Sequence, residues 1–575
     1  MSRRLVLLLL VAAATAGVVA ALPPKARLIM PPPEAAAPPV RGAIHVHTRR
    51  SDGSGTVDDV MRAAAHAGLN FVIVTDHGDG TRAGDPPEYR SGVLYIDAVE
   101  ISTDGGHVLG LGLPPSPYPL AGEPRDVVED IARLGGFSIV AHPISDKESA
   151  RWTEWTAPFS GIEWLNADSE WRDESMPQLA RVLLAYPFRP VESLARILDR
   201  SDVTLRRWDA LTQRRRVVAV AGADAHARIS PSRDPASAWS RLALPVPGYE
   251  QMFRAFSTSL PALSLTGNAA ADAASVINEI RSGRLYSVVD SLASPATFTF
   301  TGASGSERAT MGEPLALNGP VTLTVGVNAP ANATLSLYVN GEETARGAGS
   351  HLTYTAGATP AVYRVEVALP GTAGETPVPW IVSNPIYVGR PVKEEPSQHP
   401  LTPVSASTRP VGTTTEEWQV EHSAQSQGAV DVMSTTGGGT QLLFRYALSG
   451  PRSESPYAAA VLRFPKMPPL YDRVTFRARA SEPQRLSVQV RMPGGTAGSR
   501  WHRSVFIDPT PREVSVFFED MTPRGDVPAV RPRLDELEAL LFVVDTVNAK
   551  SGTSGQVAVE NLRFEAAAGR RRSHR

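Results

Sequence analysis

Nine side chains that can bind a metal ion lie before residue 230 of this 575-residue chain, in a spacing that core packing alone would not produce. Six of them are histidines. Only seven histidines precede residue 300, and His66 is the one outside the set. Clusters of histidine and carboxylate side chains mark metal or catalytic sites, so the sequence indicates a metalloenzyme. The nine are His45, His47, Asp52, His77, Glu100, His107, His142, Asp224 and His226.

The elements that must position these side chains are short apolar runs alternating with helical stretches. Val57–Ala67 and Arg125–Leu134 have helical periodicity and are followed by glycine. This alternation predicts an α/β fold with a parallel sheet. Nearly every candidate ligand falls at or just beyond the C-terminal end of a strand, where such folds hold their active sites. The expected strands are Ala43–His47, Phe71–Thr75, Leu94–Glu100, His107–Leu111, Phe137–Ala141, Gly161–Trp164 and Val217–Ala221.

His45 and His47 illustrate the geometry that a strand imposes. With a period of two, both imidazoles point to one face roughly 6.5 Å apart along the strand, and Asp224 and His226 repeat the arrangement. Imidazole and carboxylate ligands suit zinc, manganese or iron, and the chain has no cysteine to supply thiolates. Nine ligands exceed the needs of one ion, so we expect about two to three divalent metal ions. A lone histidine is better explained by a structural role, which is how we interpret His66.

Taken as a series, these motifs resemble the polymerase and histidinol phosphatase (PHP) domain. The resemblance covers residues 41–290 and is nearest to the exported metallohydrolases that include carbaryl-hydrolase-type enzymes. It implies a distorted seven-stranded α/β barrel with up to three metal ions at its C-terminal rim. The series is His45-x-His47, Ser51-Asp52-Gly53, Thr75-Asp76-His77, Glu100, Gly106-His107, Ala141-His142-Pro143 and Asp224-x-His226.

The resemblance also implies a role for each ligand. We expect Glu100, Asp224 and His226 to take part in catalysis. Asp76 either orients a metal-bound histidine or caps the turn that follows it. In the implied arrangement, the first metal would be held by His45, His47, Glu100 and Asp224; the second, bridged by Glu100, would also be held by His107 and His142; the third would be held by Asp52, His77 and His226.

The N-terminal segment bears on where the protein works. Arg3-Arg4 precede an apolar run from Leu5 to Leu22, which fits either a secretory signal peptide cleaved after Ala21 or an uncleaved membrane anchor. Both alternatives export the catalytic domain, to the periplasm, the cell surface or the medium. The net charge of −2 gives no pull toward nucleic acid, and we expect none as a partner.

A chain of this length exceeds what a single core supports. Beyond residue 290 only strand patterns remain, and the last of them resemble galactose-binding-like jelly rolls, including carbohydrate-binding modules. This module either contacts carbohydrate or acts as a spacer, and Trp418, Tyr471 and Trp501 are either stacking platforms or core residues. The expected divisions are 1–22 signal peptide or anchor, 23–40 proline-rich spacer, 41–290 metallohydrolase, 291–389 Ig-like β-sandwich, 390–416 linker, 417–566 jelly roll and 567–575 basic tail.

Two further groups of residues flank the motifs. Tryptophans gather between His142 and the last barrel strand and either form an aromatic wall at the site or pack an insertion; they are Trp152, Trp155, Trp164, Trp171 and Trp208. Arginines that could clamp an anion are Arg49, Arg50, Arg172 and Arg228.

The chemistry that this site favours is hydrolysis of a small molecule. Clustered divalent ions suit a phosphate ester, so a phosphoesterase is our leading hypothesis. A hydrolase of carbamates, esters or amides is the alternative, and a non-catalytic surface-binding protein is the third.

Overall fold

The computed structural model describes residues 15, 22–28, 38–228, 246–372, 376–389, 405–435, 438–464, 471–492, 499–524, 532 and 536–567. The apolar N-terminal run (all but Thr15 and Leu22), the basic tail from residue 568 and residues 390–404 of the expected linker lie outside this set. None of the described helices has the length and hydropathy needed to span a bilayer. The chain divides into two compact units, Met1–Pro115 with Glu123–Glu395, and Ser116–Gly122 with Pro396–Arg575.

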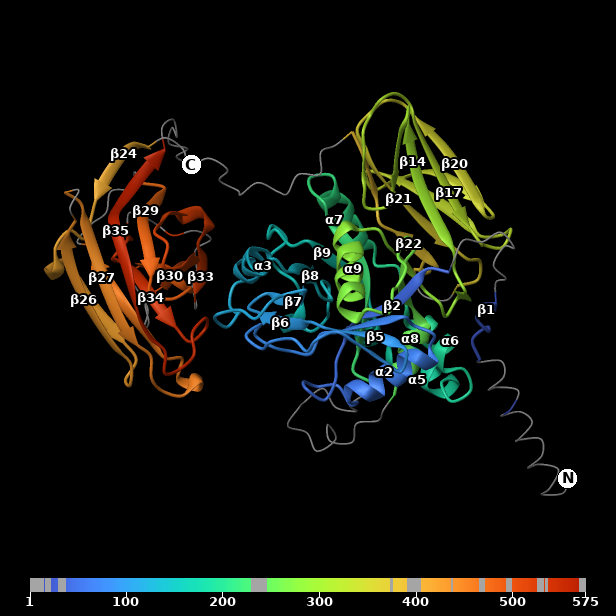
Figure 1. Ribbon diagram of the computed structural model, residues 1–575, viewed down its shortest axis with the longest axis horizontal. Coiled ribbons are helices and arrows are strands. Elements are labelled where there is room, and N and C mark those ends of the chain that lie inside the picture. Colours follow the sequence, from blue (N-terminus) through green and yellow to red (C-terminus); the bar gives the residue numbers. More distant parts are fainter. Residues whose placement is uncertain are drawn as a thin grey trace, which may run out of the picture. The chain divides into compact units, whose positions relative to one another are not determined.

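The first unit contains a closed ring of strands with helices outside it (Figure 1). Strand β2 pairs in parallel with β3 and β10, β3 pairs with β5, and β9 pairs with β8 and β10. Apolar residues such as Ile44, Ile73 and Val220 are fully buried in its core. The ring consists of β2 (Val40–Val46), β3 (Phe71–Val74), β5 (Val93–Asp97), β6 (Val99–Thr103), β7 (Gly106–Leu111), β8 (Phe137–Val140), β9 (Gly161–Asn166) and β10 (Val218–Ala225).

The expectation of a purely parallel sheet is wrong at β7, because this strand pairs antiparallel with both β6 and β8. Only Asp104 and Gly105 separate β6 from β7. A two-residue turn can join antiparallel strands, whereas a parallel pair needs a crossover of a dozen or more residues. His107 therefore stands at the start of its strand rather than at the end, yet on the same edge of the barrel as Glu100. The N-terminal region is thus a mixed α/β fold.

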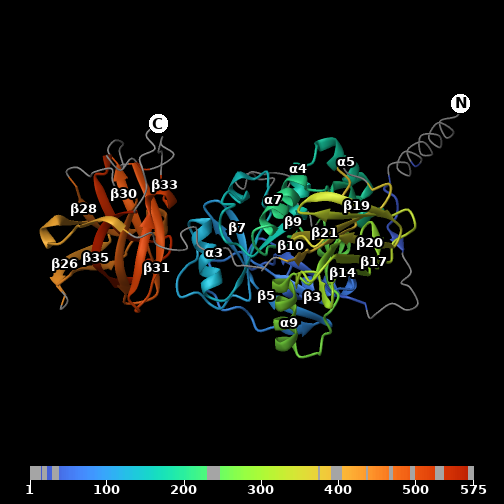
Figure 2. The same cartoon turned by 90° about the horizontal axis from the view of Figure 1, so that it is seen from above.

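Helices surround the ring, and α3 and α9 lie outside β7 and β5 (Figure 2). Helix α2 begins at a capping box formed by Thr56 and Asp59, and α9 ends at Gly283 in the left-handed region. The helices are α2 (Val57–His66), α3 (Pro124–Arg133), α4 (Ala167–Asp173), α5 (Met176–Ala185), α6 (Pro190–Leu194), α7 (Asp202–Thr212), α8 (Tyr249–Ala255) and α9 (Ala269–Ser282), with short strands β1 (Arg27–Leu28), β4 (Glu88–Arg90), β11 (Ser257–Leu260) and β12 (Tyr286–Val288).

A β-sandwich follows the barrel within the same unit. Its strand β17 alternates buried and half-buried residues, as the period of two requires. One sheet has the order β15-β14-β17-β20, and the other is continuous with the barrel through β12 and β22. The strands are β13 (Ala293–Ser294), β14 (Phe298–Ser304), β15 (Glu307–Thr310), β16 (Pro314–Leu315), β17 (Val321–Val327), β18 (Thr334–Val339), β19 (Glu342–Ala348), β20 (His351–Ala356), β21 (Ala361–Ala368), β22 (Ile381–Ser383) and β23 (Ile386–Val388).

Buried polar contacts join this sandwich to the barrel. The Asn384 side chain accepts a hydrogen bond from the Ala219 amide at 2.9 Å and donates one to the Ala219 carbonyl at 2.8 Å. Arg364 forms two contacts with Asp209 of α7, at 2.6 and 2.8 Å, and a third with Glu366 at 2.6 Å. Since Ala219 lies on β10, which carries Asp224, the sandwich supports a strand of the candidate site.

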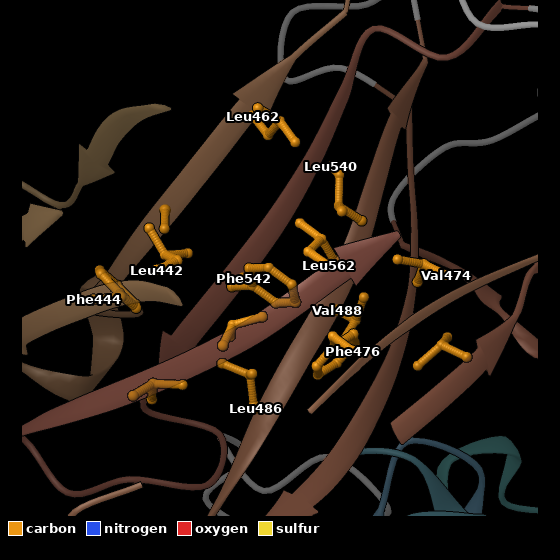
Figure 3. Packing of buried hydrophobic residues seen from close by; sticks show 14 of the residues in the cluster. Leu442, Phe444, Leu462, Val474, Phe476, Leu486, Val488, Leu540, Phe542 and Leu562 are labelled. Carbon is orange, nitrogen blue, oxygen red and sulfur yellow. The ribbon is translucent and has the colours of Figure 1, made fainter. Parts of the chain in front are cut away.

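The second unit is another β-sandwich, built from two six-stranded sheets. Its core lies between the sheets and includes Phe444, Phe476 and Phe542 (Figure 3). Strand β24 lies within the range expected for the linker. The strands are β24 (Ser405–Pro410), β25 (Trp418–His422), β26 (Gln427–Ser434), β27 (Thr440–Ala447), β28 (Tyr457–Arg463), β29 (Arg473–Ala480), β30 (Gln484–Met492), β31 (Ser499–Ile507), β32 (Arg512–Phe517), β33 (Thr522–Arg524), β34 (Ala539–Asp545) and β35 (Ser554–Ala567).

The three aromatic residues considered as stacking platforms belong to this core. Trp418 and Trp501 are 5% and 2% exposed, and Tyr471 packs against the same cluster. A sugar ring needs an exposed aromatic face, which the buried Trp418 and Trp501 cannot provide.

Removing the second sandwich should leave the reaction intact. A protein of residues 40–390 should retain hydrolase activity on small soluble substrates, because every candidate ligand lies before residue 230. Steady-state kinetics of the truncated and full-length proteins give the comparison. A truncated protein that folds, as judged by circular dichroism, but has lost activity would show that the C-terminal part contributes to the site.

Candidate metal centre

All nine candidate ligands lie at one edge of the barrel. Their ligand atoms fall into four groups, and within each group every atom lies within 4.8 Å of the others. Strands carry four of them, and the loops that follow β2, β3, β8 and β10 carry the other five. The groups are His45, His47 and Asp224; His45, Glu100 and His142; His77, Glu100 and His107; and His47, Asp52, His77 and His226.

In the innermost group, His45, His47 and Asp224, the two imidazoles lie close to the carboxylates of Asp224 and of neighbouring Glu100. Nε2 of His45 lies 3.3 Å from Oε2 of Glu100 and 3.4 Å from Oδ1 of Asp224. Nε2 of His47 lies 3.2 and 3.4 Å from the same two oxygens. Both nitrogens are buried and lack a hydrogen-bond partner among the described residues. Buried polar atoms are otherwise nearly always satisfied, so this donor set fits a bound cation.

Glu100 is the centre of the cluster. Besides His45 and His47, it contacts Nδ1 of His107 at 2.7 Å and Nε2 of His142 at 3.0 Å through Oε1, and Nδ1 of His77 at 3.2 Å through Oε2. One fully buried carboxylate thus touches five imidazoles. This is the arrangement required of a residue that bridges two metal ions.

The group around Asp52 is more open. Oδ1 of Asp52 lies 3.2 Å from Nε2 of His226 and 3.5 Å from Nδ1 of His47, and Oδ2 lies 3.6 Å from Nε2 of His77. The side chain of Asp52 is 51% exposed, whereas that of Glu100 is 1% exposed. A metal ion held here would therefore be the most accessible to substrate.

Backbone strain accompanies three of the candidate ligands. His45, His142 and Asp224 have φ angles of 67°, 29° and 42°, in the left-handed region that residues other than glycine seldom adopt. Such conformations persist only where the surrounding structure enforces them, and they concentrate at functional sites. In this conformation all three side chains belong to the ligand groups.

Glu163 is a residue of the site that sequence reasoning missed. Its Oε1 accepts from Nδ1 of His45 at 2.7 Å, and its Oε2 accepts from the His142 amide and from Asn166, both at 2.8 Å. With Nδ1–H donated to Glu163, the lone pair of neutral His45 is on Nε2 and points at the cluster. Gly222 makes room for this carboxylate, since a Cβ there would lie 1.9 Å from Oε1.

Asp76 has a different role from either one expected. It accepts hydrogen bonds from the Thr48 amide at 2.7 Å, the Thr48 hydroxyl at 2.6 Å and the Ser51 hydroxyl at 2.7 Å. It therefore fixes the loop that carries Asp52 rather than orienting His77 or capping the turn after it.

The electrostatics of the cluster suit the binding of cations. Burial alone would lower the pKa of His47, but the carboxylates of Asp224 and Glu100 beside its ring raise it to about 9. Burial alone would raise the pKa of Glu100, but the charge of His45 and the bonds from His107 and His142 hold it well below its usual value. Protons on the imidazoles thus compensate the carboxylates until metal ions replace them.

Metal-free protein should lose stability as the pH rises from about 6.5 to about 9. A histidine with a raised folded-state pKa contributes stability that is present below its ordinary pKa of 6.5 and lost as the pH passes the folded value of about 9. Metal-loaded protein should not show this loss, since metal ions bind the deprotonated rings. Thermal unfolding across this range, with chelator and with metal, tests the difference; parallel curves would contradict it.

Glu163→Gln should weaken metal binding by roughly 10- to 100-fold, the usual effect of losing a partner of a metal-bound histidine. The amide cannot accept from the His45 ring and the His142 amide as the carboxylate does. Metal affinity measured by chelator competition gives the result, with Glu307→Gln on the sandwich surface as the control. Equal affinities for both variants would remove Glu163 from the site.

The flanking tryptophans mostly pack the insertion. Trp152, Trp164 and Trp208 are at most 2% exposed. Trp155 is half-buried under Arg207, and Trp171 is half-buried on α4. They do not form a continuous aromatic wall.

The flanking arginines differ in their hydrogen-bond and ion-pair partners. Arg50 is held by Tyr95, Asp97 and Asp85. Arg49 donates to the Ser54 carbonyl. Burial lowers the pKa of Arg172 of α4, but its pair with Asp168 and the charges of Asp224 and Asp52 raise it. Of these three, Arg172 is the one whose pKa responds to carboxylates of the cluster.

Comparison with known proteins finds distant relatives of part of the chain. No family model matches the chain. A 3',5'-nucleoside bisphosphate phosphatase of Chromobacterium violaceum is 31% identical over 111 residues, which are 18% of this chain and 39% of the phosphatase. An uncharacterized protein of Methanocaldococcus jannaschii is 27% identical over 119 residues, 18% of this chain and 69% of that protein. The chain therefore spans about two fifths of the length of the phosphatase.

Solved structures with similar parts are also found. One is a two-domain protein of Bacteroides vulgatus with a predicted PHP-like metal-dependent phosphoesterase, 15% identical, covering 63% of this chain and 99% of that chain at a TM-score of 0.28. Another is a family 11 carbohydrate-binding module of Clostridium thermocellum, 14% identical, covering 28% of this chain and 96% of that chain at a TM-score of 0.23. The phosphatase similarity and the grouped ligand atoms support a distantly related, PHP-like phosphoesterase domain.

Proposed function

We propose that the barrel is a metal-dependent phosphoesterase acting on a small molecule. The observation that carries the proposal is the pair of buried Nε2 atoms of His45 and His47 that face Glu100 and Asp224 without a hydrogen-bond partner among the described residues. The other ligand groups provide for about two to three ions of zinc, manganese or iron. Similarity to a nucleoside bisphosphate phosphatase supports the same reaction class.

Each residue has a task that its position allows. Bound divalent ions would lower the pKa of a water molecule and neutralise charge on the group attacked. Glu100 and Asp224 supply the buried negative charge that holds the ions. With Asp52, His226, which is 21% exposed, would hold the ion that is most accessible to a bound substrate.

Arg172 is the reason to favour a phosphate ester. A guanidinium is suited to bind phosphoryl oxygens, and Arg172 lies on the half-buried helix beside the cluster. Half-buried Trp171, its neighbour, favours the alternative, a hydrolase of aryl carbamates, esters or amides.

Parallel assays distinguish these reactions. Metal-replete protein is tested with nitrophenyl phosphate, nitrophenyl acetate and an aryl carbamate, with His45→Ala as the inactive control. We expect turnover of the phosphate ester, inhibition by inorganic phosphate and a loss of turnover in Arg172→Met. Turnover of the carbonyl substrates alone would favour the alternative, and no metal-dependent turnover at all would favour the non-catalytic binding protein.

We also propose that the protein is exported, because Arg3-Arg4 and the run Leu5 to Leu22 form an export signal or anchor. The domain would then act in the periplasm, at the cell surface or in the medium. Protease accessibility in intact cells and spheroplasts tests this, and protection in both would contradict it.

The C-terminal sandwich is proposed to contact carbohydrate through the outer face of its sheet β25-β28-β34-β30-β31-β33. On that face, half-buried Arg500 lies opposite Arg491, which is paired with Glu421 at 2.9 and 2.6 Å. Affinity electrophoresis with acidic and neutral polysaccharides tests this, with Arg500→Ala as the variant; equal mobility in all gels would contradict it.

A further inference from the structure

Helix α5 and the turn that follows it expose apolar side chains that a folded domain normally covers. Met176, Leu183, Leu184 and Phe188 are 77%, 49%, 54% and 62% exposed. In the part of the chain that the structure describes, the large hydrophobic residues with high exposure are these four, Val203 and Met433. Contiguous exposed apolar surface marks a site of interaction.

The spacing along α5 explains the exposure. Met176, Ala180, Leu183 and Leu184 stand at positions i, i+4, i+7 and i+8, which share one face of a helix. Val182 and Ala185 on the opposite face are buried against the domain. The helix is thus apolar on both sides, with one side against the protein and the other side uncovered. We call Met176, Leu183, Leu184 and Phe188 the α5 patch.

The chain enters the domain beside this patch. Arg189, the residue after Phe188, donates to the Pro23 carbonyl, and the Ala26 amide donates to Oε1 of Glu192 at 3.3 Å. Strand β1 then pairs with β13. Figure 1 shows β1 and α6 close together. The apolar run Leu5 to Leu22 therefore ends within a few residues of the α5 patch.

Positive charge borders the patch. Arg181 of α5 and Arg196 lie close enough to interact, and the charge of Arg181 adds to the effect of burial in lowering the pKa of Arg196. Neither forms an ion pair with a carboxylate within the described ranges. An apolar helix face bordered by arginines is the pattern of a helix that lies in the interface of an anionic bilayer.

We propose that the α5 patch rests on an anionic lipid bilayer, in which the adjacent apolar run of residues 5–22 is anchored. This proposal rests on the anchored form of the N-terminal segment and does not depend on the reaction at the metal centre. The anchor would hold the domain close to the surface, and the patch would fix which side faces the lipid.

Site-directed fluorescence in the full chain tests the contact, because the absence of native cysteine allows a single label. Leu184→Cys and Phe188→Cys carry an environment-sensitive fluorophore, and Ala132→Cys, exposed at the end of α3, is the matched control. The proteins are reconstituted in vesicles of phosphatidylcholine and phosphatidylglycerol that contain nitroxide-labelled lipid. We expect blue-shifted, quenched emission at 184 and 188, and neither change at 132.

Other outcomes overturn the proposal. If the fluorophores at positions 184 and 188 emit like the one at position 132, the patch is in water. A blue shift without quenching shows that protein covers the patch. If that shift depends on protein concentration, the cover is a second copy, and if it does not, the cover is the chain's own N-terminal segment. Equal quenching in vesicles of phosphatidylcholine alone would remove the arginines from the proposal.

Discussion

Glu100→Ala should abolish turnover and release most of the bound metal. This carboxylate touches five imidazoles, and without it two of the four ligand groups lose their shared anion. Charge stabilisation by metal ions contributes several kcal/mol to such reactions, so kcat should fall by roughly 10³-fold or more. Turnover assays and metal analysis of the same preparation measure the fall in kcat and the loss of bound metal together.

His77→Ala is the comparison for Glu100→Ala, because it should affect the ligand groups unequally. It should deplete chiefly the open group around Asp52. His77 also belongs to the group with Glu100 and His107, but neither of the two groups that contain His45 includes it. If Glu100→Ala retained activity within about tenfold of the unaltered protein, the cluster would not be the catalytic centre.

Arg364→Met should destabilise the barrel and its adjoining sandwich by about 3–5 kcal/mol, because it leaves Asp209 buried without its cation, whereas Glu366 keeps its pair with Arg200. Arg364 is 3% exposed, and its guanidinium also lies 4.1 Å from the Tyr338 ring centroid. Chemical denaturation followed by tryptophan fluorescence gives the free energy of unfolding.

Arg346→Met is the matched control on the same sandwich. Arg346 pairs with Glu343 in solvent, and its side chain is 66% exposed. Arg346→Met should therefore lower the free energy of unfolding far less than Arg364→Met does. Similar losses for both variants would show that the barrel and the sandwich do not depend on the buried pair.

The candidate ligands could be found from sequence because each one sits at a strand end or in the loop next to it. The His45-x-His47 pattern needs only the period of two, and the structure brings all nine residues into the four groups. The helices α2 and α3 follow their apolar periodicity and begin within one residue of the expected positions. Local pattern was sufficient for these features.

Features that depend on tertiary packing could not be found this way. Glu163 lies in the middle of a buried strand, where an isolated glutamate gives no signal until His45 and Gly222 are placed around it. The positive φ of His45 and Asp224 follows from the closed barrel rather than from local preference. The reversal of β7, in contrast, could have been inferred from the short distance between Glu100 and His107 in the sequence.

Metal content is the most direct test of the account. Elemental analysis of full-length protein, expressed with zinc, manganese and iron in excess, should give about two to three divalent ions per chain, with the number falling in Glu100→Ala. One ion or none in the metal-replete protein, with the same value in Glu100→Ala, would contradict the assignment of this cluster as a multinuclear metal centre.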